Sequence, residues 1–323
     1  MRRLGLLALG LLACAGRPLG ASDLVTAHPG LDRAEARALV RTMPYLLPAA
    51  GQITWFSCRH ETSLPVLVSA AGELQAHEEA ALETALATLE RSVEGLRFLR
   101  VPPDEATVGV EFVEGLVARE EGDDQANTIT DCRVTGTPLG MGDPLPARIE
   151  RASMRIGRGG RLDALGREWA LTPEELTGVV IHEVVHALGL QGHGSGGLLS
   201  RDLSELARTG RAARAGQTLE DPALAGLYTL PSGTVLGRAA VSPARTQLVD
   251  RLARLAAEGE VGGPFIRVGD ASARIFWTDA RGRDYGLQIR QLKELLREPA
   301  ELVILPEART RRALPRSNDL PWP

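Results

Sequence analysis

The chain of 323 residues is long enough for one full hydrophobic core and a smaller module, and its 44% apolar and 24% charged residues are usual for a soluble globular protein. The net charge of −4 and the absence of a basic run exclude an electrostatic basis for nucleic-acid binding. No internal stretch approaches the roughly 18 consecutive apolar residues of a membrane-spanning helix, so none is predicted.

The N-terminus, residues 1–21, has the pattern of an export signal. Two arginines after the first methionine precede the apolar run Leu4–Ala13, which has signal-peptide length. The run ends in Leu-Leu-Ala-Cys and resembles the lipobox of bacterial lipoproteins, where the cysteine is lipidated. This resemblance predicts a lipid on Cys14 and attachment to the periplasmic face of the outer membrane. Cleavage after Ala15 or Ala21 is the alternative and would release a secreted protein.

Residues 22–50 are predicted to form a linker or a short propeptide, with a short helix over Leu31–Met43 between two prolines. The first globular domain is predicted over residues 51–232. Its apolar periodicities and β-rich runs indicate elements in this order: a strand at Val66–Val68, a helix over Glu78–Leu96, strands at Arg97–Val101 and Val108–Val113, a polar loop at Gly122–Gln125, and a strand over Ile149–Ile156.

A well-specified helix follows. Thr172-Pro173-Glu174-Glu175 supplies an N-cap threonine, a proline at the first helical position and a glutamate that completes a capping box. Apolar residues recur every four positions and predict one stripe that faces a core. Gly189 can take the left-handed conformation that ends a helix. The members of the apolar stripe are Leu176, Val180, Val184 and Leu188.

This helix carries the pattern of a metal site. His182 and His186 are four residues apart, so on a helix they share one face with Cβ atoms about 5–6 Å apart. Glu183 lies beside the first histidine and can serve as a general base. After Gly189 the chain can turn back and offer His193 as a third ligand. Three such ligands leave the fourth tetrahedral position open, which is typical of catalytic zinc, and Zn²⁺ is the predicted cofactor.

The order of elements and the motif are similar to the metzincin clan of zinc metallopeptidases, and matrixin-like members are the most similar. Their signature is His-Glu-x-x-His-x-x-Gly-x-x-His, which His182, Glu183, His186 and Gly189 match in place. The resemblance implies an α+β fold with a twisted mixed β-sheet, an active-site helix and a backing helix. It also implies that Ile149–Ile156 is an edge strand that pairs with extended substrate, and that Asp221–Tyr228 forms the closing helix.

Two departures from the family pattern concern the ligands and the floor of the site. The loop before His193 is one residue longer than in the signature, so Glu205 and, less strongly, Asp202 are rival third ligands. The clan places a methionine turn under the metal, but no methionine follows Met154. Leu198–Ser200 falls where that turn is expected, and leucine would supply a similar apolar floor.

Two cysteines remain after Cys14. Export would place Cys58 and Cys132 in an oxidising compartment, where they can form one disulfide. The alternatives are two buried thiols, or Cys58 as a ligand that keeps the metal latent.

The C-terminal part is predicted as a small α+β module over residues 233–305, followed by an extended Pro/Arg-rich tail, 306–323. It contains no catalytic constellation. Its predicted elements are helices over Gln247–Ala257 and Gln288–Leu296, strands at Phe265–Val268 and Ala273–Trp277, and a turn at Ala280–Arg283 into a strand at Asp284–Leu287.

Together these patterns predict an exported zinc-dependent endopeptidase in which Glu183 activates water and the partner is a protein or peptide substrate. Membrane attachment is expected only through the N-terminal lipid, and the sequence gives no oligomeric state. The alternatives are a non-catalytic or degenerate zinc-binding envelope lipoprotein of the same fold, and a scaffold whose histidines bind no metal.

Overall fold

The computed structural model describes residues 25–26, 28–42, 45–49, 51–114, 117–119, 122–124, 126–135, 145–158, 161–162, 168–193, 197–240, 243–269, 272–281, 283–289 and 303–304. The predicted signal peptide, the predicted lipidation of Cys14 and the predicted tail lie outside these residues. Among the described helices, none combines the length and the apolar character that crossing a bilayer requires.

The helices are α2 (Arg33–Thr42), α3 (Ala76–Ser92), α4 (Pro173–Ala187), the 3-10 helix η1 (Gly197–Leu199), α5 (Leu203–Arg214), α6 (Pro222–Thr229) and α7 (Pro243–Ala257). The strands are β1 (Leu46–Ala49), β2 (Gln52–Phe56), β3 (Val66–Ala71), β4 (Phe98–Arg100), β5 (Val108–Val113), β6 (Val117–Arg119), β7 (Gly122–Asp124), β8 (Ala126–Val134), β9 (Ala147–Gly157), β10 (Arg161–Leu162), β11 (Glu168–Trp169), β12 (Val235–Ala240), β13 (Val261–Gly269), β14 (Ser272–Asp279), β15 (Asp284–Ile289) and β16 (Val303–Ile304).

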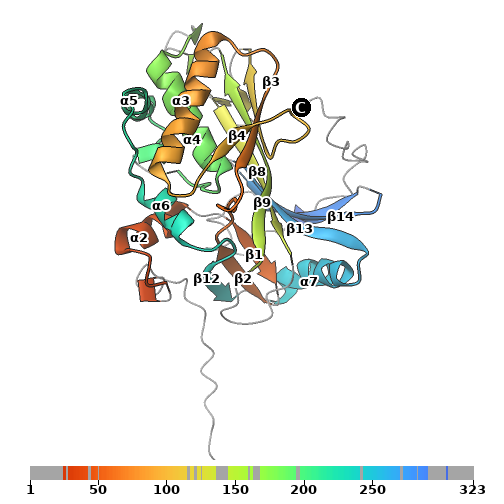
Figure 1. The fold of residues 1–323 in the computed structure, drawn as a ribbon. Helices are drawn as coiled ribbons and strands as arrows, with labels where there is room; N and C mark the ends of the chain where they lie inside the picture. The colour runs from red at the N-terminus through yellow and green to blue at the C-terminus, as the bar shows by residue number, and fades with distance from the viewer. Residues whose placement is uncertain are drawn as a thin grey trace, which may run out of the picture.

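One mixed sheet organises the fold (Figure 1). Among the described residues its nine strands have the order β16-β15-β14-β13-β8-β9-β5-β3-β4. Strands β4, β3, β5 and β9 pair in parallel, whereas every pairing from β9 through β8 to β16 is antiparallel. Helices α3, α4 and α5 lie together on one side of the sheet, with α3 and α5 packed against α4. The predicted α+β class with a mixed sheet is therefore confirmed.

Strand β9 lies inside the sheet, so the prediction that Ile149–Ile156 forms an edge is wrong. One side of β9 pairs with β5, where Ala152 lies opposite Val108, and the other side pairs with β8. The sequence did not indicate β8, because two of its inward-facing residues, Thr128 and Thr130, are polar and interrupt the apolar alternation. The predicted polar loop at Gly122–Gln125 is also wrong, since β7 pairs with β6 there.

The strands of the predicted C-terminal module extend the same sheet. Strand β13 pairs with β8 over Phe265–Val268, opposite Thr130–Arg133, and β14 and β15 follow in a meander. The predicted domain boundary after residue 232 would therefore divide a single hydrogen-bonded sheet. Gln288 and Ile289, predicted as the start of a helix, belong to β15.

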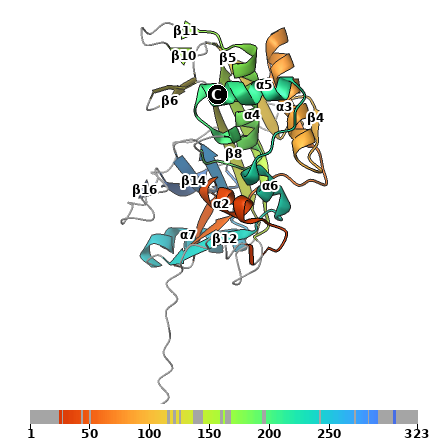
Figure 2. The ribbon, with the colours of Figure 1, turned by 90° about the vertical axis from the view of Figure 1, so that its left-hand side faces the viewer.

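The segment predicted as a linker or propeptide is packed into the fold. Leu31 is 2% exposed and Leu39 is fully buried, both in the main core, and α2 lies beside α6 (Figure 2). Strand β1 pairs with β2, and Tyr45 is fully buried in a second core. That core lies between the small sheet β1-β2-β12, helix α7 and the β8–β14 part of the large sheet. Removal of this segment would open both cores.

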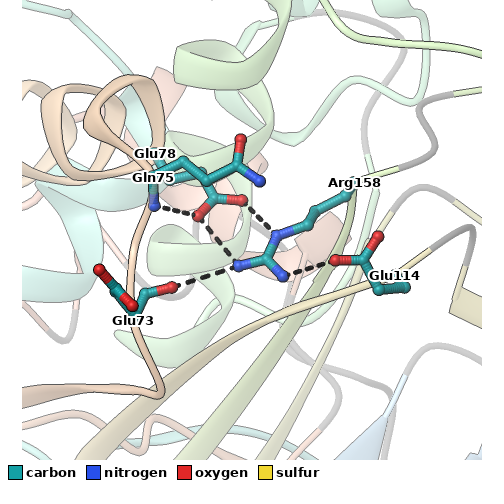
Figure 3. Close-up of polar contacts among 5 residues, drawn as sticks. All are labelled: Glu73, Gln75, Glu78, Glu114 and Arg158. Atoms are coloured by element: carbon teal, nitrogen blue, oxygen red, sulfur yellow. Dashed lines mark hydrogen bonds and ion pairs between the residues drawn. The ribbon is translucent and has the colours of Figure 1, made fainter.

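An ion-pair network joins the start of α3 to the end of β9 (Figure 3). Arg158 donates from Nε to Oε1 of Glu78 at 2.7 Å and from Nη1 to Glu114 at 2.8 Å. The Glu78 side chain is 1% exposed and also accepts from the backbone N–H of Gln75, which completes a capping box. Burial would raise the pKa of Glu78, but the hydrogen bonds from Arg158 and Gln75 outweigh it and hold that pKa below its usual value.

Helix α4 is buried on all sides from Leu176 to Ala187, which corrects the prediction of a single apolar stripe. Two glycines let α5 approach it closely. A Cβ on Gly178 would overlap the carbonyl oxygen of Leu206, and a Cβ on Gly210 would overlap that of Glu174. The two backbones therefore meet at a distance that only glycine permits.

We expect Gly210→Ala to lower the free energy of unfolding by about 1–2 kcal/mol. Alanine would gain about 1 kcal/mol of helix propensity, but overlap with the backbone carbonyl of Glu174 is expected to cost about 2–3 kcal/mol, the upper part of the range for overpacking. Urea unfolding measures the difference. The control is Gly30→Ala, whose added Cβ would lie 3.5 Å from Thr229 in ordinary contact. Equal free energies of unfolding for Gly210→Ala and the parent would show that α4 and α5 can move apart without loss of stability.

Candidate metal centre

Local sequence signals begin and end α4 as predicted. The Thr172 side chain accepts from the backbone N–H of Glu175, the Glu175 carboxylate accepts in return from the N–H of Thr172, and Pro173 opens the helix. Gly189 follows the last turn with φ +119°, and a Cβ there would overlap the carbonyl oxygen of Cys58. Glycine is therefore required at the point where the chain leaves the helix.

Three histidines converge at this end of α4. The Nε2 atoms of His182 and His186 are 2.9 Å apart, and those of His186 and His193 are 3.3 Å apart. The ligand atoms of all three lie within 4.8 Å of one another. Tetrahedral zinc with Zn–N bonds of 2.0–2.1 Å separates its ligand nitrogens by roughly 3.3 Å. The three histidines therefore lie close enough to bind one metal ion.

Backbone carbonyls orient the two helical histidines. Nδ1 of His182 donates to the carbonyl of Leu198 at 2.8 Å, and Nδ1 of His186 donates to the carbonyl of Leu190 at 2.5 Å. Because a carbonyl can only accept, both protons sit on Nδ1 and both Nε2 lone pairs remain for a ligand bond. Leu198 belongs to η1, which lies against α4 where the sequence predicts the substitute for a methionine turn.

The loop that carries His193 is held by other parts of the chain. Nε2 of Gln191 lies 2.8 Å from the carbonyl of His186 and 2.7 Å from Oγ1 of Thr130. The backbone N–H of Gly192 donates to the carbonyl of Thr42, at the end of α2, at 2.8 Å. Through these bonds the N-terminal segment and β8 fix the turn that brings His193 back to the helix.

The rival third ligands lie outside the histidine cluster. Glu205 forms an ion pair with Arg208 at 2.8 Å, and Asp202 caps α5 by accepting from the N–H of Ser204. Among the described residues, the group that can hold a metal contains only His182, His186 and His193.

Glu183 is 4% exposed, and its carboxylate contacts a residue that the sequence did not indicate. Oγ1 of Thr128, on β8, donates to Oε2 of Glu183 at 2.5 Å. Thr128 itself is 1% exposed. His193 is half-buried, so the metal-binding face is more open on its side than at the helix.

The predicted disulfide between Cys58 and Cys132 is present. It joins the segment after β2 to β8, and the carbonyl of Cys58 lies at Gly189, the end of the metal-binding helix. The alternatives of two buried thiols and of Cys58 as a metal ligand are therefore wrong.

His60 is a buried histidine without a predicted role. It is 7% exposed, and its Nε2 lies 3.2 Å from the carbonyl of Ala187 in α4, to which it can donate. Burial lowers the pKa of His60 to about 4; the hydrogen bond to Ala187 opposes this shift and the charge of Arg59 adds to it. The imidazole is therefore neutral in the folded protein at neutral pH.

We expect the free energy of unfolding to fall by about 2 kcal/mol between pH 7 and pH 5 through His60 alone. In this window the unfolded histidine, with a pKa near 6.5, binds a proton that the folded one excludes, so acid favours unfolding. Urea unfolding at several pH values should give a shallower decline for His60→Gln. Both proteins share the three site histidines, so the difference between their curves isolates His60.

The matched control is His77→Gln, at an exposed histidine on α3. A change in this curve as large as that for His60→Gln would assign the effect to the loss of any histidine. Parallel curves for His60→Gln and the parent would show that His60 is not held neutral.

Two cavities lie away from the three histidines of the metal cluster. One of about 610 Å³ is lined by Arg59, Arg133 and Arg148 among others, and one of about 380 Å³ is lined by His60, Leu67 and Ile149 among others. Neither includes a residue of the metal cluster.

In comparisons with known proteins, no protein-family model and no curated sequence matches the chain.

Proposed function

We propose that this protein is an exported zinc-dependent endopeptidase that holds its metal through His182, His186 and His193. The observation that carries the proposal is the convergence of three imidazole nitrogens at the end of a helix that also carries Glu183, the residue after His182. Three nitrogen ligands that leave one position open, with a carboxylate next to a ligand in the sequence, are typical of a catalytic zinc site rather than of a closed structural one. The resemblance of the sequence motif to the metzincins supports the same reaction.

Each residue has a defined task in this proposal. Bound zinc would lower the pKa of water at its open position and polarise the scissile carbonyl. An oxygen of the Glu183 carboxylate takes a proton from the attacking water and later delivers it to the leaving amine nitrogen. His182 and His186 keep their Nδ1 protons on the carbonyls of Leu198 and Leu190 throughout, so their Nε2 atoms stay directed at the ligand position.

An extended substrate would pair with β8 rather than with β9. Strand β13 covers β8 along Thr130–Arg133 only, and within the described part of the chain no strand pairs with the same side of Ala126–Ile129. A peptide added to this part of the edge would lie next to the strand that carries Thr128, the residue in contact with Glu183.

The disulfide supports export, because disulfides persist in oxidising compartments. Attachment through a lipid on Cys14 remains part of the proposal. The burial of Glu183 favours a second candidate function, a zinc-binding envelope protein without catalytic activity.

The deciding experiment uses the mature protein purified without chelator. Elemental analysis should give one zinc per chain, and incubation with a peptide library should yield internal cleavages. 1,10-Phenanthroline should stop the cleavage and added zinc should restore it. Stoichiometric zinc without cleavage would support the non-catalytic candidate, whereas a metal-free protein that fails to take up zinc would refute the metal centre.

A further inference from the structure

We propose that Thr128 is a positioning residue that fixes the carboxylate of Glu183 for proton transfer; this inference rests on the proposed peptidase function. The hydroxyl of Thr128 lies 2.5 Å from Oε2 of Glu183 and 3.2 Å from its backbone carbonyl. A hydroxyl carries one proton, and the carboxylate oxygen lies at the shorter distance, so the hydroxyl donates to Oε2 rather than to the backbone carbonyl.

Burial increases the effect of this hydrogen bond on the position of the Glu183 carboxylate. Glu183 is 4% exposed and Thr128 is 1% exposed, so little water is available to hold the carboxylate in place. Removal of this donor takes one hydrogen bond from a buried carboxyl group, which costs free energy and permits other side-chain positions. The bond also crosses the fold, since Thr128 lies on β8 and Glu183 lies on α4, 55 residues later.

The position of Thr128 in β8 links the base to the sheet. Thr128 lies opposite Met154 of the interior strand β9, so its backbone is fixed by the pairing of two long strands. Strand β8 also contacts α4 directly. A rigid strand thus holds the hydroxyl, and the hydroxyl holds the carboxylate. A group that transfers a proton must lie within about 0.5 Å of its productive position, and these contacts constrain the carboxylate in that way.

The test compares Thr128→Val, which keeps the shape and removes the hydroxyl, with Thr128→Ser, which restores it. Thr128→Val should lower kcat about 10- to 100-fold, with KM within about twofold and one zinc per chain. Thr128→Ser should recover most of kcat. A valine variant with full kcat, or a loss of kcat that serine does not restore, would overturn the proposal.

Thr88→Val is the matched control. Thr88 is fully buried on α3, and its hydroxyl accepts a hydrogen bond from Arg91 rather than contacting Glu183. This variant should lose stability on heating, yet keep its kcat. An equal fall in kcat for both valine variants would assign the effect to the loss of any buried hydroxyl and contradict a role specific to Glu183.

Crystal structures of the metal-free variants give a readout that does not depend on activity. The Glu183 carboxylate should move by about 1 Å or more in Thr128→Val and keep its place in Thr128→Ser, a displacement large enough to matter for catalysis. An unmoved carboxylate in the valine variant would refute the positioning role. If the parent cleaves no peptide, the peptidase proposal fails, and these structures still decide whether Thr128 positions Glu183.

Discussion

Glu183→Gln is expected to lower kcat/KM by about a thousandfold while the zinc content stays at one per chain. Glutamine has nearly the shape of glutamate, but its amide cannot accept the proton of the attacking water. It can still accept the hydrogen bond that Thr128 donates in the parent protein, so the helix and the ligands should keep their arrangement. Steady-state kinetics on a peptide identified in the library, together with elemental analysis, measure both quantities.

The control for this variant is Glu205→Gln on α5. Glu205 pairs with Arg208 and is absent from the histidine cluster, so its kinetics should match those of the parent. Full activity of Glu183→Gln would refute the proposed mechanism. Loss of zinc together with activity would instead show that Glu183 supports the metal site.

Replacing His182 or His186 with alanine is expected to weaken zinc binding roughly 10²- to 10⁴-fold. An affinity of about 10–16 kcal/mol, as in structural zinc sites, divided among three ligands gives about 3–5 kcal/mol for each ligand. His193→Ala should follow with a smaller loss, because water can replace a half-buried ligand more readily than one buried in the helix. Competition against a zinc-binding dye measures the affinities.

Glu205→Ala distinguishes the two candidates for the third ligand. It should bind zinc like the parent if His193 is the ligand, and lose affinity if a glutamate from the later helix is used instead. Circular dichroism of the metal-free variants checks that a lost site is not an unfolded protein. Unchanged affinity in His186→Ala would contradict the site altogether.

The local part of the site could be predicted from the sequence. A capping box, a helical spacing of two histidines and a glycine that ends the helix depend on neighbouring residues only, and Thr172, His182 and Gly189 take the places expected. Cys58 and Cys132 could be paired because no other cysteine besides Cys14 was available.

The non-local part of the site could not be predicted from the sequence. Thr128 and Thr130 look like polar surface residues in the sequence, yet both are buried because Glu183, Tyr45 and Gln191 satisfy their hydroxyls. The prediction that β9 is an edge came from the resemblance to the metzincins, and the pairing of β9 with β8 contradicts it. The segment around Leu31 and Leu39 was interpreted as a linker because its contacts come from residues far along the chain.

The placement of that segment limits how the protein can be regulated. Thr42 accepts a hydrogen bond from the loop that presents His193, and Leu31 and Leu39 fill the main core. A zymogen that is activated by trimming its N-terminus loses a segment that the mature enzyme does not need. Residues from Leu31 onward do not meet that condition here, so activation by N-terminal trimming would have to cut upstream of this buried leucine.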